Sequence, residues 1–352
     1  MWRWKIRGNP CRFAASWGHF MRVSGVTRGA MTAFSILSLV LPFAGITASA
    51  LAQSYPAKPI RLIIDTAPGG VTDILGRMSA ESLALQSGRQ VIVENKSGSS
   101  GHIALDYLAH APNDGYTLMM VGGGNLVIQP FLQKSLPFDP LNDFLPIFNV
   151  AETPHILVVP QVLPANTVAE FVAYAKSNPG KINYGSAGIG SPPHLSGYLF
   201  ARTTGINLTH VPYKGVAGTM PDLVAGRIQL VSMSLGSART NLNAGNLKAL
   251  ATAARKRLGG LPSVPTAAEA GIPGWDMSAW FGVFSPRDTN PEVVRYINGK
   301  MQAWVDEPRT RARFLDIGAE SIGGSPASFA ERVRSDFKYW GQVIKESGIT
   351  LD

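Results

Sequence analysis

The first half of the chain alternates short apolar runs with amphipathic stretches of helical period. Apolar runs of about four to eight residues between turn signals are typical of strands, and apolar residues three or four apart predict a helix. We therefore expect strands at 60–64, 91–93 and 117–121, and helices from about 72 to 88 and at 103–110. Ile74, Leu75, Met78 and Leu85 should form the buried face of the first helix. This βαβαβ order predicts a parallel sheet.

The second half of the chain restarts the same alternation. Thr167 and Glu170 have the spacing of a capping box, which starts a helix. The expected elements are strands at 156–159, 182–184, 208–211, 228–233, 249–253 and 281–284, and helices at 167–176, 193–200, 291–305 and 329–346. The two strand series place boundaries near His155 and Met277 and predict two α/β lobes.

The N-terminal 52 residues have the features of a secretory signal peptide. They contain six basic residues and no acidic residue, then an apolar run at 33–46 and small residues that offer cleavage before Gln53. A membrane anchor is the alternative, but about 14 apolar residues fall short of the ~20 that cross a bilayer. We expect cleavage after Ala52, and Met21 offers a second start that gives a signal of ordinary length.

Removal of this leader changes the charge and the cysteine content. The whole chain carries a formal charge of +9, but 26 basic and 23 acidic residues remain after residue 52, which leaves +3. No basic run with interleaved aromatic residues remains, so we expect no nucleic-acid partner. The only cysteine is Cys11, so the mature chain should contain no disulfide, catalytic thiol or thiolate metal site.

Glycine-rich loops follow the expected strands at 60–64 and 182–184; they lie at 67–70 and 185–190. Each loop leads into a helix, whose N-terminus carries a partial positive charge and free N–H groups that suit an anion. Ligands of open α/β sheets bind at the carboxyl ends of the strands, where these loops lie. Tight turns are the alternative explanation, because glycine is the usual residue where φ is positive.

The loops lack the signature of a nucleotide-binding enzyme. Glu94 ends the second strand about where a ribose-binding acid would lie, but the first loop reads A-P-G-G-V-T-D rather than G-x-G-x-x-G. Asp73, in the first helical turn, would repel a pyrophosphate. Walker A, G-x-S-x-G and H-E-x-x-H sequences are absent, and the five histidines after the leader form no close pair. We therefore expect neither enzyme activity, cofactor nor metal.

His194 is the histidine that we single out for the ligand site. It follows Ser191 and two prolines at the mouth of the second loop, where it could contact a ligand or simply end a loop. The alternative function is a secreted hydrolase of similar two-lobe architecture that would use Asp73 and His194. No set of nucleophile, base and orienting group is visible to support it.

Nine short motifs occur in order along the mature chain. They are Y-P-A-K-P-I-R at 55–61, A-P-G-G-x-x-D at 67–73, V-E-N-K-S-G at 93–98, A-P-N-D-G-Y-T at 111–117, N-P-G-K-I-N-Y at 178–184, H-V-P-Y-K-G at 210–215, L-P-S-V-P-T at 261–266, E-A-G at 269–271 and W-F-G at 280–282. This series resembles the Bug receptors, the periplasmic components of tripartite tricarboxylate transporters in Gram-negative bacteria.

The resemblance implies an α/β periplasmic binding protein of Venus-flytrap architecture, with two Rossmann-like lobes joined by crossing strands. Lobe 1 would comprise 53–155 plus 278–352, and lobe 2 would be the inserted segment 156–277. It implies a monomeric periplasmic receptor that captures a small organic acid for uptake or sensing, with permease subunits as possible membrane partners. The implied ligand-binding residues are Thr66, Ala67, Gly69, Gly70, Thr72, Asp73, Gly124, Asn125, Ser186, Ala187, Ser191, His194 and Tyr213.

Three positions depart from the family pattern. Asp65 and Thr66 stand where the family usually has P-F, so a hydroxyl replaces an aromatic wall. The loop after the third strand is often G-T-S-G-T-H, whereas here 121–126 reads V-G-G-G-N-L without hydroxyls. Met233 occupies an often-acidic position. These changes are compatible with binding of a carboxylate group. They leave the rest of the ligand open, so di- or tricarboxylates, aromatic acids and amino acids all fit.

Asp73 has two possible roles. An acidic residue in a first helical turn stabilises the helix by about 0.3–1 kcal/mol through the helix dipole and needs no ligand. The role that the resemblance supports is different: the carboxylate would orient a water, hydroxyl or amino group of the ligand, since it cannot attract the ligand's own carboxylate.

Overall fold

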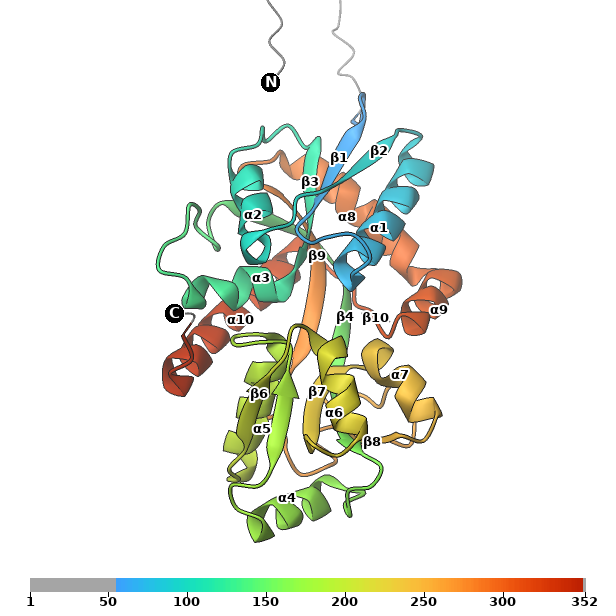
Figure 1. Ribbon diagram of the computed structural model, residues 1–352. Coiled ribbons are helices and arrows are strands. Elements are labelled where there is room, and N and C mark those ends of the chain that lie inside the picture. The colour runs from blue at the N-terminus through green and yellow to red at the C-terminus, as the bar shows by residue number, and fades with distance from the viewer. Residues whose placement is uncertain (1–54, 351–352) are drawn as a thin grey trace, which may run out of the picture. The chain divides into compact units, whose positions relative to one another are not determined.

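The computed structural model describes residues 55–350. The predicted signal peptide, residues 1–52, lies outside these residues. Within the described part of the chain, no helix combines the length and the apolar character needed to cross a bilayer. The described residues form two groups of strands with helices packed on both (Figure 1).

The first sheet contains the βαβαβ unit predicted from the start of the chain. Its strands are β1 (Ile60–Ile64), β2 (Val91–Asn95), β3 (Thr117–Gly122), part of β4 (Phe144–Pro160), β9 (Ser278–Pro286) and the short β10 (Glu320–Ser321). β1 lies between β2 and β3 and is parallel to both, which confirms the predicted parallel arrangement. β9 pairs antiparallel with β3 and with β4, so the order is β2-β1-β3-β9-β4.

The second sheet takes the remainder of β4 together with four strands from the second half of the chain. These are β5 (Asn183–Ser186), β6 (Thr209–Pro212), β7 (Leu230–Ser234) and β8 (Leu247–Thr252). β5 is parallel to β6 and β7, whereas β4 is antiparallel to β7 and β8. Each of these strands overlaps a segment in which a strand was expected.

β4 passes from one sheet into the other. Residues 144–154 pair with β9 in the first sheet, and residues 155–160 pair with β7 and β8 in the second. Pro146 and Pro154 lie within the strand, and its register against β9 shifts after Pro146 and again after Asn149. Proline within an apolar run argues against a central strand, and a sheet accepts it mainly at a bulge. For this reason the sequence predicted only residues 156–159 of β4.

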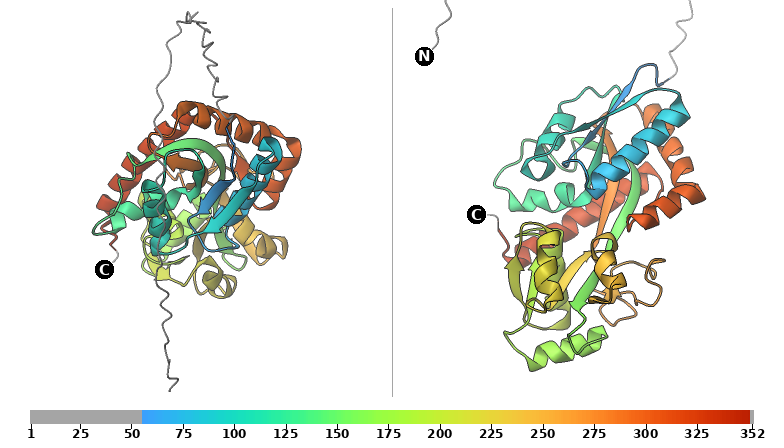
Figure 2. Two further views of the ribbon diagram at one scale, coloured as in Figure 1. Left: turned by 90° about the horizontal axis from the view of Figure 1, so that it is seen from above. Right: turned by 45° about the vertical axis from the view of Figure 1, so that its right-hand side comes forward.

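Helices cover both faces of each sheet. In the first lobe they are α1 (Val71–Ser87), α2 (His102–Ala109), α3 (Gly123–Val127), α8 (Pro291–Asp306), α9 (Pro308–Asp316) and α10 (Pro326–Ser347); in the second they are α4 (Val168–Ser177), α5 (Pro192–Thr204), α6 (Met220–Val224) and α7 (Leu235–Asn243). α1, α8 and α9 share one buried cluster with the first sheet, and α2, α3 and α10 share another (Figures 1 and 2). Short 3-10 turns, η1 (Ser99–Gly101), η2 (Gln129–Leu132) and η3 (Val216–Thr219), precede or follow several helices.

The buried face of α1 differs from the one predicted. Leu75 and Met78 are buried as expected, but Leu85 is 80% exposed. The helix turns its small residues toward the sheet instead: a Cβ at Gly76 would lie 2.7 Å from Cδ1 of Ile64. Because Gly76 allows the helix to approach β1 so closely, the buried face rotates away from Leu85, and the prediction for that residue was wrong.

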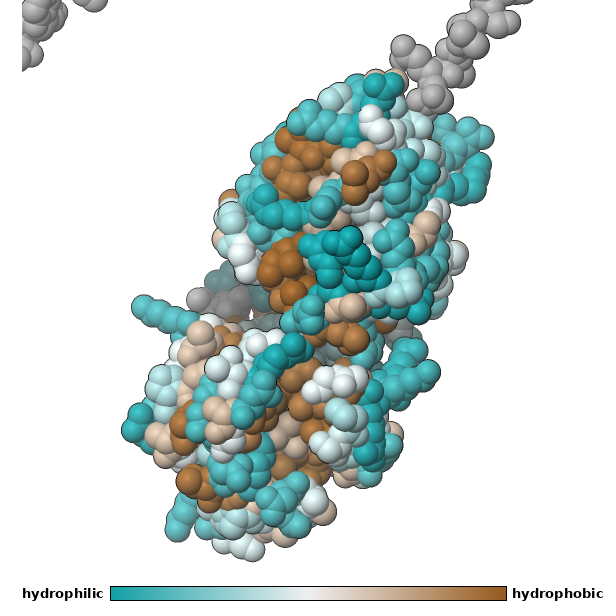
Figure 3. All heavy atoms as spheres, turned by 90° about the vertical axis from the view of Figure 1, so that its right-hand side faces the viewer, coloured by the Kyte–Doolittle hydropathy of each residue, from teal (hydrophilic) through white to brown (hydrophobic). Residues whose placement is uncertain are grey.

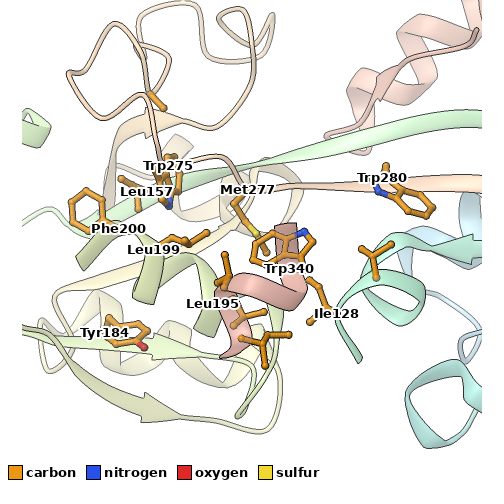
Figure 4. Close-up of a cluster of buried hydrophobic side chains, with 14 of the residues drawn as sticks. Ile128, Leu157, Tyr184, Leu195, Leu199, Phe200, Trp275, Met277, Trp280 and Trp340 are labelled. Atoms are coloured by element: carbon orange, nitrogen blue, oxygen red, sulfur yellow. The ribbon is translucent and has the colours of Figure 1, made fainter. Parts of the chain in front are cut away.

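One hydrophobic cluster is continuous between the two lobes. It includes Ile128 from the first lobe, Leu195 on α5, Met277 before β9 and Trp340 on α10. Figure 4 shows Trp340 lying close to Met277, Leu195 and Ile128. On the face seen in Figure 3, by contrast, hydrophobic residues form separate patches among hydrophilic ones. The crossing strands and α10 thus join the two lobes through a shared apolar core.

Candidate functional site

Three loops at the carboxyl ends of strands contain most of the predicted ligand residues. The first loop, 65–73, runs from the end of β1 into the first turn of α1. The second loop, 186–194, runs from the last residue of β5 into the start of α5, and the third loop, 122–125, runs from the last residue of β3 into α3. β1 and β3 are parallel neighbours, so the first and third loops emerge at the same edge of the sheet.

The first loop is held in shape by the carboxylate of Asp73. Its Oδ2 accepts a hydrogen bond from the Gly69 N–H at 2.9 Å, and its Oδ1 accepts from Asn95 Nδ2 at 2.8 Å and from Arg77 Nε at 3.0 Å. Asn95 Nδ2 also donates to the carbonyl of Thr66 at 2.9 Å. The hydrogen bond from Arg77 lowers the pKa of Asp73 to about 2. Both oxygens are therefore engaged inside the loop, an arrangement that favours a structural role for this acid.

The first loop leaves open space above its glycines. Gly69 has a φ of +93°, which an L side chain rarely adopts, whereas Gly70 has a φ of −79° at the N-cap of α1. A Cβ at either position would meet no heavy atom within 4 Å. Thr72 is buried, and Ala67 is exposed. The backbone of this loop is thus accessible to a ligand.

Asp65 connects the first loop to the third. Its side chain is 1% exposed, and its Oδ2 accepts hydrogen bonds from the Gly122 N–H at 3.1 Å and from Asn125 Nδ2 at 3.0 Å. Oδ1 of Asp65 and Oγ1 of Thr66 are buried without a hydrogen-bond partner. Burial raises the pKa of Asp65 to about 7. The sequence showed Asp65 only as a departure from the family pattern, and an acidic residue at the end of a buried strand was the signal that could have placed it in the site.

The second loop is held by hydroxyl and imidazole groups. Ser186 is fully buried, and its Oγ lies 2.6 Å from Nε2 of His210 and accepts from the Gly188 N–H at 3.0 Å. Ser191 Oγ donates to the Gly188 carbonyl at 2.6 Å. His194 Nδ1 accepts from the N–H of the neighbouring Gly190 at 3.0 Å. The loop therefore brings the predicted residues Ser186, Ser191 and His194 together, and their side chains bond to Gly188, Gly190 and His210.

His194 and His210 stack on each other beneath this loop. Their ring centroids are 3.7 Å apart and the rings are nearly parallel, at 10°. Burial, followed by the neighbouring His210, lowers the pKa of His194 to about 4, and burial lowers the pKa of His210 as well. Because Nδ1 of His194 accepts a backbone hydrogen bond, its proton sits on Nε2 and the ring is neutral.

Tyr213 lies at the edge of the second loop, and its hydroxyl has a partner elsewhere. Its N–H donates to the Ser186 carbonyl at 3.0 Å, while its hydroxyl donates to Asp222 Oδ2 at 2.6 Å. Ala187 accepts a longer hydrogen bond from the Gly215 N–H at 3.4 Å. Burial and the neighbouring Asp222 raise the pKa of Tyr213 to about 12, so the hydroxyl stays protonated at neutral pH.

The third loop adjoins the second lobe near the crossing strands. A Cβ at Gly124 would lie 3.8 Å from Cγ of Pro192, the first residue of α5. These two residues, together with Trp280 and Trp340, help to line a small cavity of about 20 Å³. Gly124 and the start of α5 are therefore neighbours although they are far apart in the sequence.

Within residues 55–350, no group of three histidine, cysteine, aspartate or glutamate side chains is placed to hold a metal ion. Ser186 and His210 form a short hydroxyl–imidazole contact, but Ser186 is fully buried beneath its loop. Asp73 and His194, the pair of the hydrolase alternative, are each hydrogen bonded within their own loop.

Comparison with known proteins gives consistent relatives. The family model "Tripartite tricarboxylate transporter family receptor" matches residues 75–349. Protein BugT of Bordetella pertussis is 30% identical over 318 residues, which cover 90% of this chain and 98% of that protein. Among solved structures, R. palustris Rpa4515 with adipate is 36% identical, with a TM-score of 0.72 over 84% of this chain and 99% of its own. MatC from Rhodopseudomonas palustris with bound malate is 30% identical, with a TM-score of 0.68 over 82% and 100% of the two chains.

Proposed function

Because the chain belongs to the tripartite tricarboxylate transporter receptor family, we propose that it is a periplasmic receptor whose two lobes close around a small carboxylate for uptake or sensing. Two relatives support a carboxylate as ligand, since their structures were solved with adipate and with malate. The receptor is proposed to act by binding without turnover, as a monomer that delivers its ligand to permease subunits. The N-terminal leader directs it to the periplasm.

The lobes that close are proposed to be 53–155 plus 278–352 and 156–277. The change of partner within β4, from β9 up to residue 154 to β7 and β8 from residue 155, supports the first of these boundaries. Bending of β4 and β9 at this point would let the loops of the two lobes approach each other. Hinge closure of this kind moves a few residues at the ends of elements and leaves each lobe intact.

We base this proposal on the backbone N–H groups at the start of α1, which have no acceptor among residues 55–350. The first intrahelical bond runs from the Ile74 N–H to the Gly70 carbonyl, so the N–H groups of Val71, Thr72 and Asp73 have no backbone acceptor. They lie at the positive end of a 17-residue helix and directly follow Gly69 and Gly70, where a Cβ would meet no heavy atom within 4 Å. A ligand carboxylate placed there would accept these hydrogen bonds, as anions do at helix N-termini.

The second loop is proposed to bind the ligand more weakly through its backbone. α5 begins with Pro192 and Pro193, which have no N–H, and the Gly188 and Gly190 N–H groups already donate to Ser186 and His194. Fewer backbone donors remain than at α1, so the second lobe would complete the site by closing over a carboxylate already held by the first. Thr66, Ala67, Gly69, Gly70, Thr72, Asp73, Gly124, Asn125, Ser186, Ala187, Ser191, His194 and Tyr213 remain the proposed site residues.

A thermal-shift screen of organic acids tests the proposal. A ligand present at 100 times its dissociation constant stabilises the native state by about 2.7 kcal/mol, a shift that such a screen detects. Calorimetry then gives the affinity, and mass spectrometry of the released compound should recover it unchanged. Chemical conversion of the bound acid, or the absence of binding by every di- and tricarboxylate, aromatic acid and amino acid tested, would contradict a carboxylate receptor.

A further inference from the structure

The contact between Asp65 and Asn125 fixes which end of the Asn125 amide is available to a ligand. Asp65 Oδ2 accepts two hydrogen bonds, from the Gly122 N–H and from Asn125 Nδ2. An amide that donates through its nitrogen must turn its oxygen away from the acceptor. A flipped amide would place its oxygen against the acceptor Oδ2 of Asp65, so the hydrogen bond itself holds the orientation.

The oxygen of this amide is unused within the described chain. Asn125 is half-buried, and its Oδ1 accepts no hydrogen bond from the described residues. This oxygen is also not one of the fully buried oxygens without a partner. It therefore stays accessible to solvent. Asn125 directly follows Gly124, which adjoins the start of α5, so this acceptor lies in the loop proposed to contact the ligand.

On the basis of the proposed receptor function, we propose that Asp65 is a positioning residue that presents the Asn125 oxygen to the ligand, so that the receptor selects carboxylates that also carry a hydrogen-bond donor. A hydroxyl or an ammonium group on the ligand satisfies this acceptor. A plain dicarboxylate brings only methylene groups or further acceptors, and it leaves the desolvated amide oxygen without a partner. Unpaired polar groups of this kind are what lets a site reject an analogue that lacks the donor.

The orientation does not depend on the protonation of Asp65. Two N–H groups point at Oδ2, so the proton that this carboxyl takes up sits on Oδ1, which has no partner. Oδ2 is an acceptor in both states. The preference for a donor-bearing ligand should therefore be the same at pH 5.5 and at pH 8.5, although burial brings the pKa of Asp65 to about 7.

Calorimetry with matched acids tests this inference on the purified protein. The probes are succinate, malate and aspartate, which share a carbon skeleton, and adipate with 2-hydroxyadipate as a longer pair. We expect the donor-bearing member of each pair to bind about tenfold more tightly, the effect of about 1.4 kcal/mol. Malate and aspartate distinguish a hydroxyl from an ammonium group as the preferred donor.

Three variants separate positioning from mere support of the loop. Asn125→Leu removes the acceptor and Asp65→Leu removes its anchor, and both should reduce the tenfold preference to less than about twofold. Asp65→Asn keeps an oxygen at the Oδ2 position and should retain the preference. A purely structural role would weaken both members of a pair equally and leave their ratio unchanged. If Asp65→Leu does not fold, as circular dichroism would show, Asn125→Leu alone decides.

The outcomes also separate the inference from the proposed function. Equal affinity for both members of each pair in the wild-type protein, or an unchanged ratio in Asn125→Leu, overturns the inference and leaves a carboxylate receptor intact. Failure of all five acids to bind, together with the wider screen, contradicts the proposed function and the inference with it.

Discussion

The two glycine-rich loops follow the same succession of strand, loop and helix, yet they are held in place by different chemistry. The first loop depends on charge: Asp73 receives hydrogen bonds from Arg77, Asn95 and Gly69. The second depends on neutral groups, with Ser186 between His210 and Gly188. The same local geometry can therefore be preorganised by an ion pair or by hydroxyl and imidazole groups. Asp65 in the first loop and the stacked histidines of the second loop predict opposite responses to pH.

The largest effect is expected at Gly70. Gly70→Val adds a side chain where the backbone of the first loop is open, so we expect the affinity for a carboxylate to fall at least 100-fold. The φ of −79° at Gly70 suits valine, and a Cβ at this position would meet no heavy atom within 4 Å. The melting temperature should therefore stay close to that of the wild type. Gly259→Val is the matched control, since Gly259 also has open space around it. Wild-type affinity in Gly70→Val would place the site elsewhere.

The second loop has no glycine that can be tested in this way. Gly188 and Gly190 have φ values of +125° and +71°, and a Cβ at Gly190 would lie 2.5 Å from Leu132. Substitution there would strain the fold and alter binding together. The two loops should instead differ in their response to pH.

Raising the pH should destabilise the first loop through Asp65. Its folded-state pKa is raised to about 7, above the ordinary value of 3.8, so the folded state binds more protons than the unfolded state between these values. Stability is present at low pH and is lost as pH rises toward and through 7. From pH 5 to pH 8 we expect a loss on the order of 2 kcal/mol in urea denaturation. Asp65→Asn should lack this loss, and an equal pH slope in the variant would contradict the assignment.

Asp73 should affect stability more than ligand affinity. Both carboxylate oxygens of Asp73 accept hydrogen bonds, from Gly69, Asn95 and Arg77. In Asp73→Asn an NH2 group replaces one of these oxygens and faces a donor, so at least one hydrogen bond is lost. Loss of a hydrogen bond to a charged group predicts a destabilisation of about 1.5 kcal/mol, measured by urea denaturation. An unchanged free energy of unfolding combined with tenfold weaker binding would instead support the ligand-orienting role for this residue.

Lowering the pH should act on the second loop through its stacked histidines. The folded-state pKa of His194 is lowered to about 4, so the unfolded state binds more protons below pH 6.5, and stability is lost as the pH falls from 6.5 toward 4. We expect a loss of about 1–2 kcal/mol at pH 5. His194→Asn, which keeps an acceptor for Gly190, should reduce this loss. His110→Asn is the control, because the side chain of His110 is exposed; an equal reduction in both variants would refute the assignment.

Local sequence patterns predicted the elements that local forces determine. The strands β1, β2 and β3, the parallel pairing of β1 and the glycine-rich loops all follow from apolar periodicity and turn residues within a few positions. The N-terminal part of β4 was missed because its prolines hide a strand whose partner, β9, follows only after the whole second lobe. Leu85 was misplaced because the close approach of Gly76 to Ile64 decides which face of α1 is buried.

The loops of the candidate site could be outlined from the sequence, but the contacts inside them could not. The glycines marked the first and second loops, and Arg77 stands one helical turn after Asp73, where a pair could have been expected. Asp65 and Asn125, by contrast, are separated by 60 positions and meet only because β1 and β3 are neighbours in the sheet. The stacking of His194 on His210 likewise depends on the pairing of β5 with β6.

The central place of β9 in the first sheet has a consequence for the order of folding. β9 lies between β3 and β4, yet residues 161–277 separate it in the chain from β4. Until residue 286 is available, β3 and β4 each present an edge with unpaired N–H and C=O groups, to which another chain could add. The second lobe can gather β5, β6, β7 and β8 before then. The first sheet can therefore be completed only after the second lobe has been synthesised, and the edges of β3 and β4 stay open to aggregation until β9 pairs with them.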